Sequence, residues 1–348
     1  MHLHIMAWIS SILVFFVGIV PVGLQPRFVA ANLAMLANPV AGFETNALLI
    51  WQDDELVHET YFNGFDINTL HPVHAITRTV LKALVGIAIA QGYIEGVDQH
   101  VTDFYPEVEI APGQESKRDM TVAHLLTMTS GLDAHQSDHP VWSAPDIGAA
   151  IFALPQEAAP GELVRFRSYR SVTIELLSAL LARAVGRSAH AYANDVLFGP
   201  LGITDVHWEA LADGTSRSTI GLYLTPRDML RFGLLYLNDG VFAGQQIIPE
   251  AWVVASRPVP RTCSGLRTYW GRDSYANAFA AHEGTSFVAR GAGGQFIIID
   301  PDNNAVTVRT GTYANELGFF QFFFPLLRML IAPRGSSPCP CRQAFAFE

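Results

Sequence analysis

The pattern of hydrophobic positions predicts one long buried helix near the start of the folded chain. Within residues 71–92, apolar side chains recur at helical spacing and a glycine follows where the pattern stops. The apolar positions are Val80, Leu81, Leu84, Val85, Ala88 and Ile89, and the glycine is Gly92. Glycine commonly follows the last turn of a helix. We therefore expect a loop that runs into a buried helix near residue 75, which ends before Gly92.

Strand patterns occur near both ends of the sequence. Two β-rich runs in residues 46–62 flank an Asp-Asp pair, which predicts a hairpin. Further strands are expected over residues 285–290, 295–300 and 305–310, with a tight turn at residues 301–304 between the last two. Residues 317–331 then predict a phenylalanine-rich C-terminal helix. Packing on the sheet is the favoured interpretation of this helix, and contact with a membrane surface is the alternative.

Capping residues predict the shorter helices. Thr121 is expected to cap a short helix that Gly131 ends in the left-handed conformation, and we expect this helix to dock beside the long one. An apolar helix is predicted over about residues 173–185. Thr225 as N-cap, followed by Pro226 at the first helical position, predicts another helix start.

Composition narrows the function classes. The net charge of −10 argues against a nucleic-acid-binding surface. The sequence has no basic run, no glycine-rich phosphate loop and no zinc-like Cys/His spacing, so we expect no metal and no cofactor. The three cysteines, Cys263, Cys339 and Cys341, cannot all pair within one chain. A bond from Cys263 to the tail in an exported protein and unpaired thiols are both open.

The first residues have a membrane-like pattern. Residues 1–25 contain no Asp, Glu, Lys or Arg, and residues 5–24 form a mostly apolar run of about bilayer-spanning length. We expect a signal or membrane anchor in residues 1–30, and therefore a membrane-anchored or exported (periplasmic or extracellular) protein; a wrongly assigned start codon is the other explanation. The folded domain is expected over residues 31–332 and a disordered tail over residues 333–348.

Several motifs occur in an order that resembles a known family. The long helix opens with Ala-Ile-Thr-Arg at residues 75–78, and Tyr169-Arg-Ser resembles a Tyr-x-Asn/Ser motif. Residues 290–295, Arg-Gly-Ala-Gly-Gly-Gln, resemble a strand motif that stands in for Lys-Thr-Gly. Across residues 45–332 the chain resembles the serine β-lactamase and penicillin-binding-protein superfamily, in particular its esterase and 6-aminohexanoate-oligomer-hydrolase branch. The resemblance implies an α+β fold, in which an antiparallel sheet flanked by helices carries a mostly helical lobe inserted at about residues 100–215.

The resemblance also implies a site in the cleft between the two lobes. In the family a serine attacks an ester or amide carbonyl, a lysine one turn further along the helix manages its proton, and a tyrosine protonates the leaving group. The resemblance assigns the tyrosine to Tyr169. It assigns the two oxyanion-binding N–H groups to Ala75 and to Ala292, which follows Gly291. Arg290 is expected either to bind a substrate carboxylate or to pair with a surface acid.

The two positions that carry the family's chemistry differ in this chain. Ala75 stands where the family has its serine, and Arg78 stands where it has its lysine. Alanine has no nucleophile, and arginine stays protonated and cannot act as a base near neutral pH. Loss of a serine nucleophile costs on the order of 10⁶ in rate. We therefore expect a non-acylating pseudo-hydrolase that binds a small acyl, ester, amide or peptide-like ligand.

Two alternatives stay open at this point. Thr79 and Lys82 form a Thr-x-x-Lys pattern one turn deeper, and an activated water near Tyr169 is a second route to an active hydrolase of unusual mechanism. The other alternative is a membrane-tethered interaction protein with a vestigial cleft. His74 and His282 are expected near the cleft, where a lone histidine is more often structural or exposed than catalytic.

Overall fold

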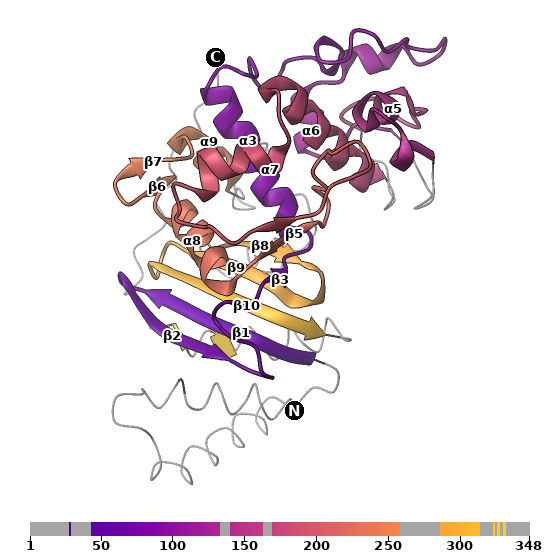
Figure 1. The fold of residues 1–348 in the computed structure, drawn as a ribbon. Helices are drawn as coiled ribbons and strands as arrows, with labels where there is room; N and C mark the ends of the chain where they lie inside the picture. The colour runs from indigo at the N-terminus through magenta and orange to yellow at the C-terminus, as the bar shows by residue number, and fades with distance from the viewer. Residues whose placement is uncertain are drawn as a thin grey trace, which may run out of the picture.

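The molecule is built on one antiparallel sheet, with helices above it in Figure 1. The computed structural model describes residues 28, 43–132, 140–162, 169–257, 286–313, 323, 326–327 and 330–331. The sheet has five strands in the order β2-β1-β10-β9-β8. These strands are β1 (Phe43–Gln52), β2 (Glu55–Tyr61), β8 (Phe287–Gly291), β9 (Gln295–Asp300) and β10 (Ala305–Tyr313). Since β1 pairs with β10, the two ends of the folded chain share one sheet.

The predicted hairpin and the predicted tight turn are both confirmed. Asp53 and Asp54 connect β1 to β2 with positive φ angles of 55° and 67°. Two left-handed residues give a turn whose twist matches that of the strands. Between β9 and β10, the Asp300 carboxylate accepts hydrogen bonds from the backbone and side chain of Asn303, and Asn304 has a φ of 47°.

Both faces of the sheet are covered, which explains the nearly continuous apolar runs in its strands. Successive strand residues point to opposite faces. Leu49 therefore joins the core under the helices, whereas Leu48 joins a second cluster on the other face. In that second cluster the Phe323 ring stacks on Phe296 with centroids 6.0 Å apart. The described residues of the predicted C-terminal helix are buried there, as the core-packing interpretation expects: Phe323, Leu326, Leu327, Leu330 and Ile331.

The long helix is α3 (Ile76–Ala90), and its prediction is confirmed. It is buried on nearly every side, and Gly92 follows it with a φ of 78°. Around it lie the other helices, of which α8 lies on β9 and β10. They are α4 (Val122–Leu126), α5 (Ile147–Ala153), α6 (Tyr169–Val185), α7 (Ala189–Ala193), α8 (Pro226–Leu237) and α9 (Glu250–Ser256).

Short elements complete the described chain. The small strands are β3 (His71–Pro72), β4 (His207–Trp208), β5 (Leu222–Leu224), β6 (Val241–Phe242) and β7 (Gln245–Gln246). The 3-10 turns are η1 (Val101–Asp103), η2 (Glu115–Asp119), η3 (Pro140–Ser143) and η5 (Ala292–Gly294), and η4 (Asn194–Phe198) is π-helical. Strand β5 pairs with both β3 and β4, and so joins the entry of α3 to a distant part of the chain.

The predicted helix caps are confirmed, with one correction. Thr225 caps α8 by accepting from the Asp228 N–H at 3.2 Å, and the Thr121 N–H at the start of α4 donates to His124 Nδ1 at 3.0 Å. The prediction that Gly131 ends α4 is wrong. The helix stops at Leu126, and Met128 takes the left-handed conformation with a φ of 54°.

Gly131 belongs to the turn that follows. Its φ is 72°, and a Cβ there would overlap the carbonyl oxygen of Ala158, so a close backbone contact requires the glycine.

Helix α4 packs against α6.

The segments with predicted membrane or disulfide roles fall largely outside this description. Residues 1–27 and 332–348 and all three cysteines lie outside the described residues. Within the described ranges, no helix has the length and apolar character needed to cross a bilayer.

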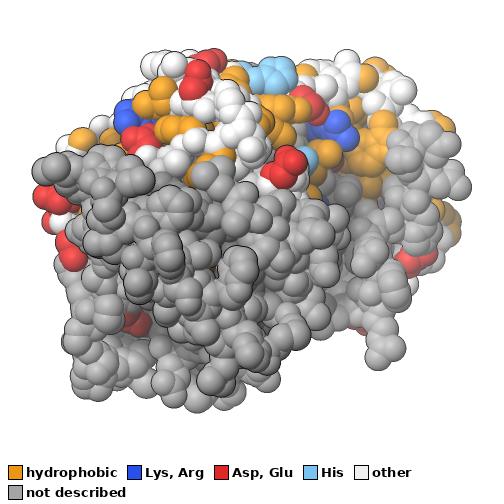
Figure 2. All heavy atoms as spheres, turned by 90° about the horizontal axis from the view of Figure 1, so that it is seen from below, with side chains coloured by type: hydrophobic (Ala, Val, Ile, Leu, Met, Phe, Trp, Pro, Cys, Tyr) orange, Lys and Arg blue, Asp and Glu red, His pale blue; other side chains and the backbone are white. Residues whose placement is uncertain are grey.

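Seen from below the sheet, the described side chains combine hydrophobic groups with charges of both signs (Figure 2).

Candidate active site at the start of helix α3

The end of β8 lies directly against the entry to α3. A Cβ atom at Gly291 would overlap the carbonyl oxygen of Val73 and would stand 3.1 Å from the His74 Cβ. Ala75 follows His74, and Ala292 follows Gly291. The fold therefore brings the two alanines expected to donate oxyanion N–H groups close together, although they are far apart in the sequence.

The backbone bends sharply just before α3. His74 has a φ of 50°, a conformation that costs a non-glycine residue on the order of 1 kcal/mol or more. Ala75 is the N-cap, with φ −64° and ψ −9°. Among the described residues, the Ala75 N–H has no backbone acceptor. It is thus placed as a donor at the positive end of a buried helix.

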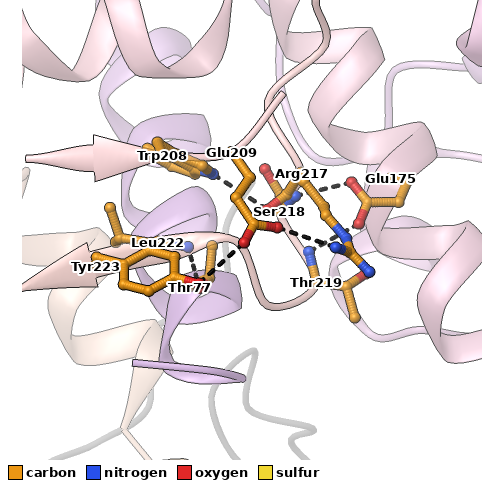
Figure 3. A network of polar contacts seen from close by, with 9 residues as sticks. All are labelled: Thr77, Glu175, Trp208, Glu209, Arg217, Ser218, Thr219, Leu222 and Tyr223. Atoms are coloured by element: carbon orange, nitrogen blue, oxygen red, sulfur yellow. Dashed lines mark hydrogen bonds and ion pairs between the residues drawn. The ribbon is translucent and has the colours of Figure 1, made fainter. Parts of the chain in front are cut away.

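Thr77 fixes this entry to the neighbouring sheet. Its hydroxyl donates to the His74 carbonyl at 2.6 Å. The same hydroxyl accepts from the Leu222 N–H of β5 at 3.2 Å, as Figure 3 shows. Burial also lowers the pKa of the His74 imidazole. A neutral imidazole beside Ala75 adds no charge to the site.

Arg78 is directed toward the helical part of the molecule. Its Nε donates to the carbonyl oxygen of Thr219 at 3.4 Å, and its Nη1 lies 3.9 Å from the sulfur of Met128. The guanidinium therefore connects the first turn of α3 to two other segments. Arginine remains charged in such a position.

The Thr79 and Lys82 pair lies one turn further into α3. Thr79 is half-buried, and Lys82 is 5% exposed. Residues three apart share a helix face, so the two side chains lie on the same side of α3. Their role as an alternative nucleophile and base stays a prediction.

A buried carboxylate that sequence reasoning missed holds the segment facing Arg78. Glu175 of α6 is 2% exposed, and its two oxygens accept from the Ser218 N–H at 2.8 Å and from the Thr219 N–H at 2.9 Å (Figure 3). Burial raises the pKa of Glu175, and these hydrogen bonds oppose the shift. The available signal was that Glu175 is the only acidic residue in α6. Glu175 thus positions the carbonyl that Arg78 contacts.

The outer end of the same segment is held by polar contacts near the surface. Glu209 accepts from Arg217 Nη1 at 2.9 Å and from the Tyr223 hydroxyl at 3.0 Å (Figure 3). The Trp208 indole N–H donates to the Arg217 carbonyl at 3.2 Å. Exposed ion pairs of this kind contribute little stability, so the buried Glu175 is the stronger anchor.

The structure describes only the backbone of Tyr169 and does not describe His282, two residues that the sequence placed at or near the site. Tyr169 is the first residue of α6, which packs against α3, but its side chain lies outside the described part of the chain. Its role as a proton donor stays a prediction. His282 also lies outside the described residues.

Arg290 points away from the start of α3. Phe287 and Ala289 join the core under the helices, whereas Val288 joins the cluster on the opposite face of the sheet. By strand alternation, Arg290 lies on the same face as Val288. Its Nη2 donates to the Tyr313 hydroxyl at 2.6 Å, and Tyr313 packs on that second cluster. The expectation that Arg290 binds a ligand carboxylate at the start of α3 is corrected, because its side chain lies on the opposite face of the sheet. The alternative, that Arg290 pairs with a surface acid, stays a prediction.

In the described ranges, no group of three or more His, Cys, Asp and Glu side chains is arranged to hold a metal ion. The candidate site combines the Ala75 and Ala292 amides, the Arg78 guanidinium and the segment fixed by Glu175.

This architecture defines a class of protein. An antiparallel sheet whose edge strand ends against the first turn of a buried helix, with further helices beside that helix, is a β-lactamase-like α+β fold. The Beta-lactamase family profile matches residues 34–319, and the chain belongs to this family. The predicted fold class and the resemblance seen in the sequence are confirmed.

Known relatives agree with this assignment. The chain is 22% identical to the 6-aminohexanoate-dimer hydrolase of Paenarthrobacter ureafaciens over 77% of this chain and 73% of that protein. A penicillin-binding protein homologue from Caulobacter crescentus superimposes with a TM-score of 0.63 at 16% identity, covering 83% of this chain and 92% of the other. A family VIII carboxylesterase superimposes with a TM-score of 0.64 at 16% identity, covering 88% and 98%.

Proposed function

We propose that this β-lactamase-family protein binds a small acyl, amide or peptide-like ligand at the start of α3 without forming an acyl-enzyme. The observation that carries the proposal is the pair Ala75 and Arg78 at the mouth of the helix. A methyl group cannot attack a carbonyl carbon. A guanidinium cannot take up a proton near neutral pH.

Binding does not require the missing groups. The backbone amides of Ala75 and Ala292 remain as donors for a carbonyl oxygen whatever the side chains are. Arg78 adds a positive charge close by, held by the Thr219 carbonyl. A ligand with a polarised carbonyl and a nearby negative charge suits these groups. The relative from Paenarthrobacter ureafaciens is named as a 6-aminohexanoate-dimer hydrolase. Two 6-aminohexanoate units joined by one amide bond keep one free carboxylate. That dimer is therefore the first probe to use.

Covalent labelling and ligand binding together test the proposal. The purified chain is treated with a fluorophosphonate and with a penicillin, and any adduct is mapped by mass spectrometry. The melting temperature is measured with and without 6-aminohexanoate dimer, because a ligand that binds only the folded state stabilises it. We expect stabilisation by the dimer, no adduct and no hydrolysis.

Each other outcome overturns the proposal in a defined way. An adduct on Thr79 or on a serine would establish an active hydrolase of unusual mechanism. Hydrolysis of the dimer without an adduct would point to an activated water. The absence of both labelling and stabilisation would favour the interaction protein with a vestigial cleft.

A further inference from the structure

Arg309, in the middle of β10, is a fully buried cation. Its side chain is 0% exposed, and burial lowers its pKa to about 9. Taking a guanidinium out of water is costly unless its hydrogen bonds are satisfied inside the protein. The groups that it contacts therefore indicate what the residue is for.

Those contacts lie where regular strand pairing stops. Nη1 donates to the carbonyl of Gly294 at 2.7 Å. Nη2 donates to the carbonyl of Glu44 at 2.7 Å, and Nε donates to the Thr45 hydroxyl at 3.3 Å. Glu44 and Thr45 lie beside a register shift in β1, and Gly294 ends the turn η5 that begins with Ala292. One side chain thus supplies donors that the irregular backbone of two segments lacks.

The backbone around Arg309 leaves room only for glycine. A Cβ atom at Gly294 would overlap Arg309 Nη1, and one at Gly311 would lie 2.8 Å from Nη2. Gln295 adds a second link, because its Nε2 donates to the Gly311 carbonyl at 2.6 Å and to the Ala292 carbonyl at 3.4 Å. The η5 turn is therefore held by two side chains, Arg309 from the middle of β10 and Gln295 from the first position of β9.

We propose that Arg309, assisted by Gln295, is a positioning residue that sets the direction of the Ala292 N–H toward the ligand at Ala75. The proposal rests on the proposed function in one respect, namely that the Ala292 N–H contacts the ligand. Sites of this kind need their donors within about 0.5 Å of the productive position. The planar fork of arginine places two different nitrogens 2.7 Å from the Gly294 and Glu44 carbonyls, whereas lysine would have only one nitrogen for both.

Arg309→Lys in the full-length chain tests the proposal, and Lys117→Met is the matched control. Lys117 is also a buried cation that donates to two carbonyls, those of Phe152 and Leu154, but it lies beside α5. Backbone amide hydrogen exchange is measured by mass spectrometry on peptides that cover residues 291–294. We expect exchange there to rise by about ten-fold or more in Arg309→Lys, the range set by the loss of one charged hydrogen bond. Lys117→Met should leave exchange at residues 291–294 unchanged.

Unchanged exchange in Arg309→Lys, or an equal rise in both variants, would overturn the proposal. If Arg309→Lys does not fold, hydrogen exchange is measured on Gln295→Ala in its place. Exchange at residues 291–294 should then rise in Gln295→Ala and not in Lys117→Met. Unchanged exchange, or an equal rise in both variants, would again overturn the proposal. Exchange needs no ligand, so this result stands whether or not the proposed function fails. Where the parent binds 6-aminohexanoate dimer, Arg309→Lys should weaken that binding by about ten-fold, the equivalent of one charged hydrogen bond, and Lys117→Met should not. Equal affinity of Arg309→Lys and parent would also overturn the proposal.

Discussion

The carbonyl oxygen of Val73 occupies the space that a Cβ atom would need at Gly291. This contact holds the edge strand of the sheet against the entry to α3. Gly291 has a φ of −110°, which any residue adopts, so its requirement for glycine is purely steric. Gly291→Ala should push β8 away from Val73 and cost about 1–3 kcal/mol, as overpacking does. It should also weaken ligand binding by separating the two amides.

Gly96→Ala is the control for that change. A Cβ at Gly96 would have no atom within 4 Å, and its φ is also permissible for alanine. Urea unfolding should show a change within about 0.5 kcal/mol for this surface variant. If Gly291→Ala were as stable as Gly96→Ala and bound ligand as well as the parent, the close approach of β8 and α3 would not matter.

If Ala75 and Arg78 stand in place of a catalytic serine and lysine, as the proposed function holds, introducing those two residues should create activity. Ala75→Ser alone should give little activity, because Arg78 offers no site for the serine proton. Ala75→Ser with Arg78→Lys should form an acyl-enzyme with a small activated ester, detected by mass spectrometry. The gain should be strongly non-additive, since a nucleophile and its base act as a unit.

Tyr169→Phe in that double variant is the accompanying test. If Tyr169 protonates the leaving group, the hydroxyl-free variant should lose most of the gain, by about 10²–10⁴-fold. A double variant that folds but stays inert to activated esters would mean that the site has diverged beyond Ala75 and Arg78.

Glu175 should be important for both stability and the site. Glu175→Gln replaces one acceptor with an amide NH₂ that would face a backbone N–H of Ser218 or Thr219. One buried donor is then unsatisfied, which costs about 1–3 kcal/mol by chemical denaturation. The Thr219 carbonyl should also move relative to Arg78, so ligand affinity should fall. Arg217→Ala, which removes only an exposed ion pair, should cost less than about 1 kcal/mol. Equal losses in the two variants would contradict this ranking.

Two buried histidines should make the fold acid-sensitive. Burial lowers the pKa of His58 and of His71 from 6.5 to about 4. The unfolded chain therefore binds more protons between pH 4 and pH 6.5, and stability falls as the pH is lowered through that range. The free energy of unfolding is not reduced by these histidines above pH 6.5. As the pH falls from 6.5 to 4, each histidine should lower it by roughly 3 kcal/mol.

Phenylalanine replacements separate this effect from other acid-sensitive groups. The His58 ring stacks on Phe28, and the His71 ring stacks on Phe65, so an aromatic substitute keeps the packing. His58→Phe and His71→Phe should each reduce the slope of unfolding free energy against pH between 4 and 6.5. Above pH 7 the curves should run parallel to that of the parent. An unaltered slope at acid pH would assign the sensitivity to other groups.

The elements that depend on local pattern were predictable from the sequence. The periodicity that ends before Gly92 corresponds to α3, the Asp53–Asp54 turn joins β1 to β2, and Thr225 caps α8. In each case the physical cause acts within a few residues: helical or strand periodicity, a left-handed turn, or a hydroxyl that accepts an N–H. The family motifs likewise depend on residues that lie close together in the sequence.

Only the tertiary structure decided the contacts between distant segments. Nothing near Glu175 in the sequence indicates that it binds the amides of residues 218 and 219, and nothing near Arg309 indicates the turn at Gly294. The face on which Arg290 lies follows from strand register, which the pairing of β8 with β9 sets. Buried charges must find partners wherever the fold supplies them, because water cannot reach them. Sequence therefore determined the elements of this protein, and packing determined which polar groups meet at the start of α3.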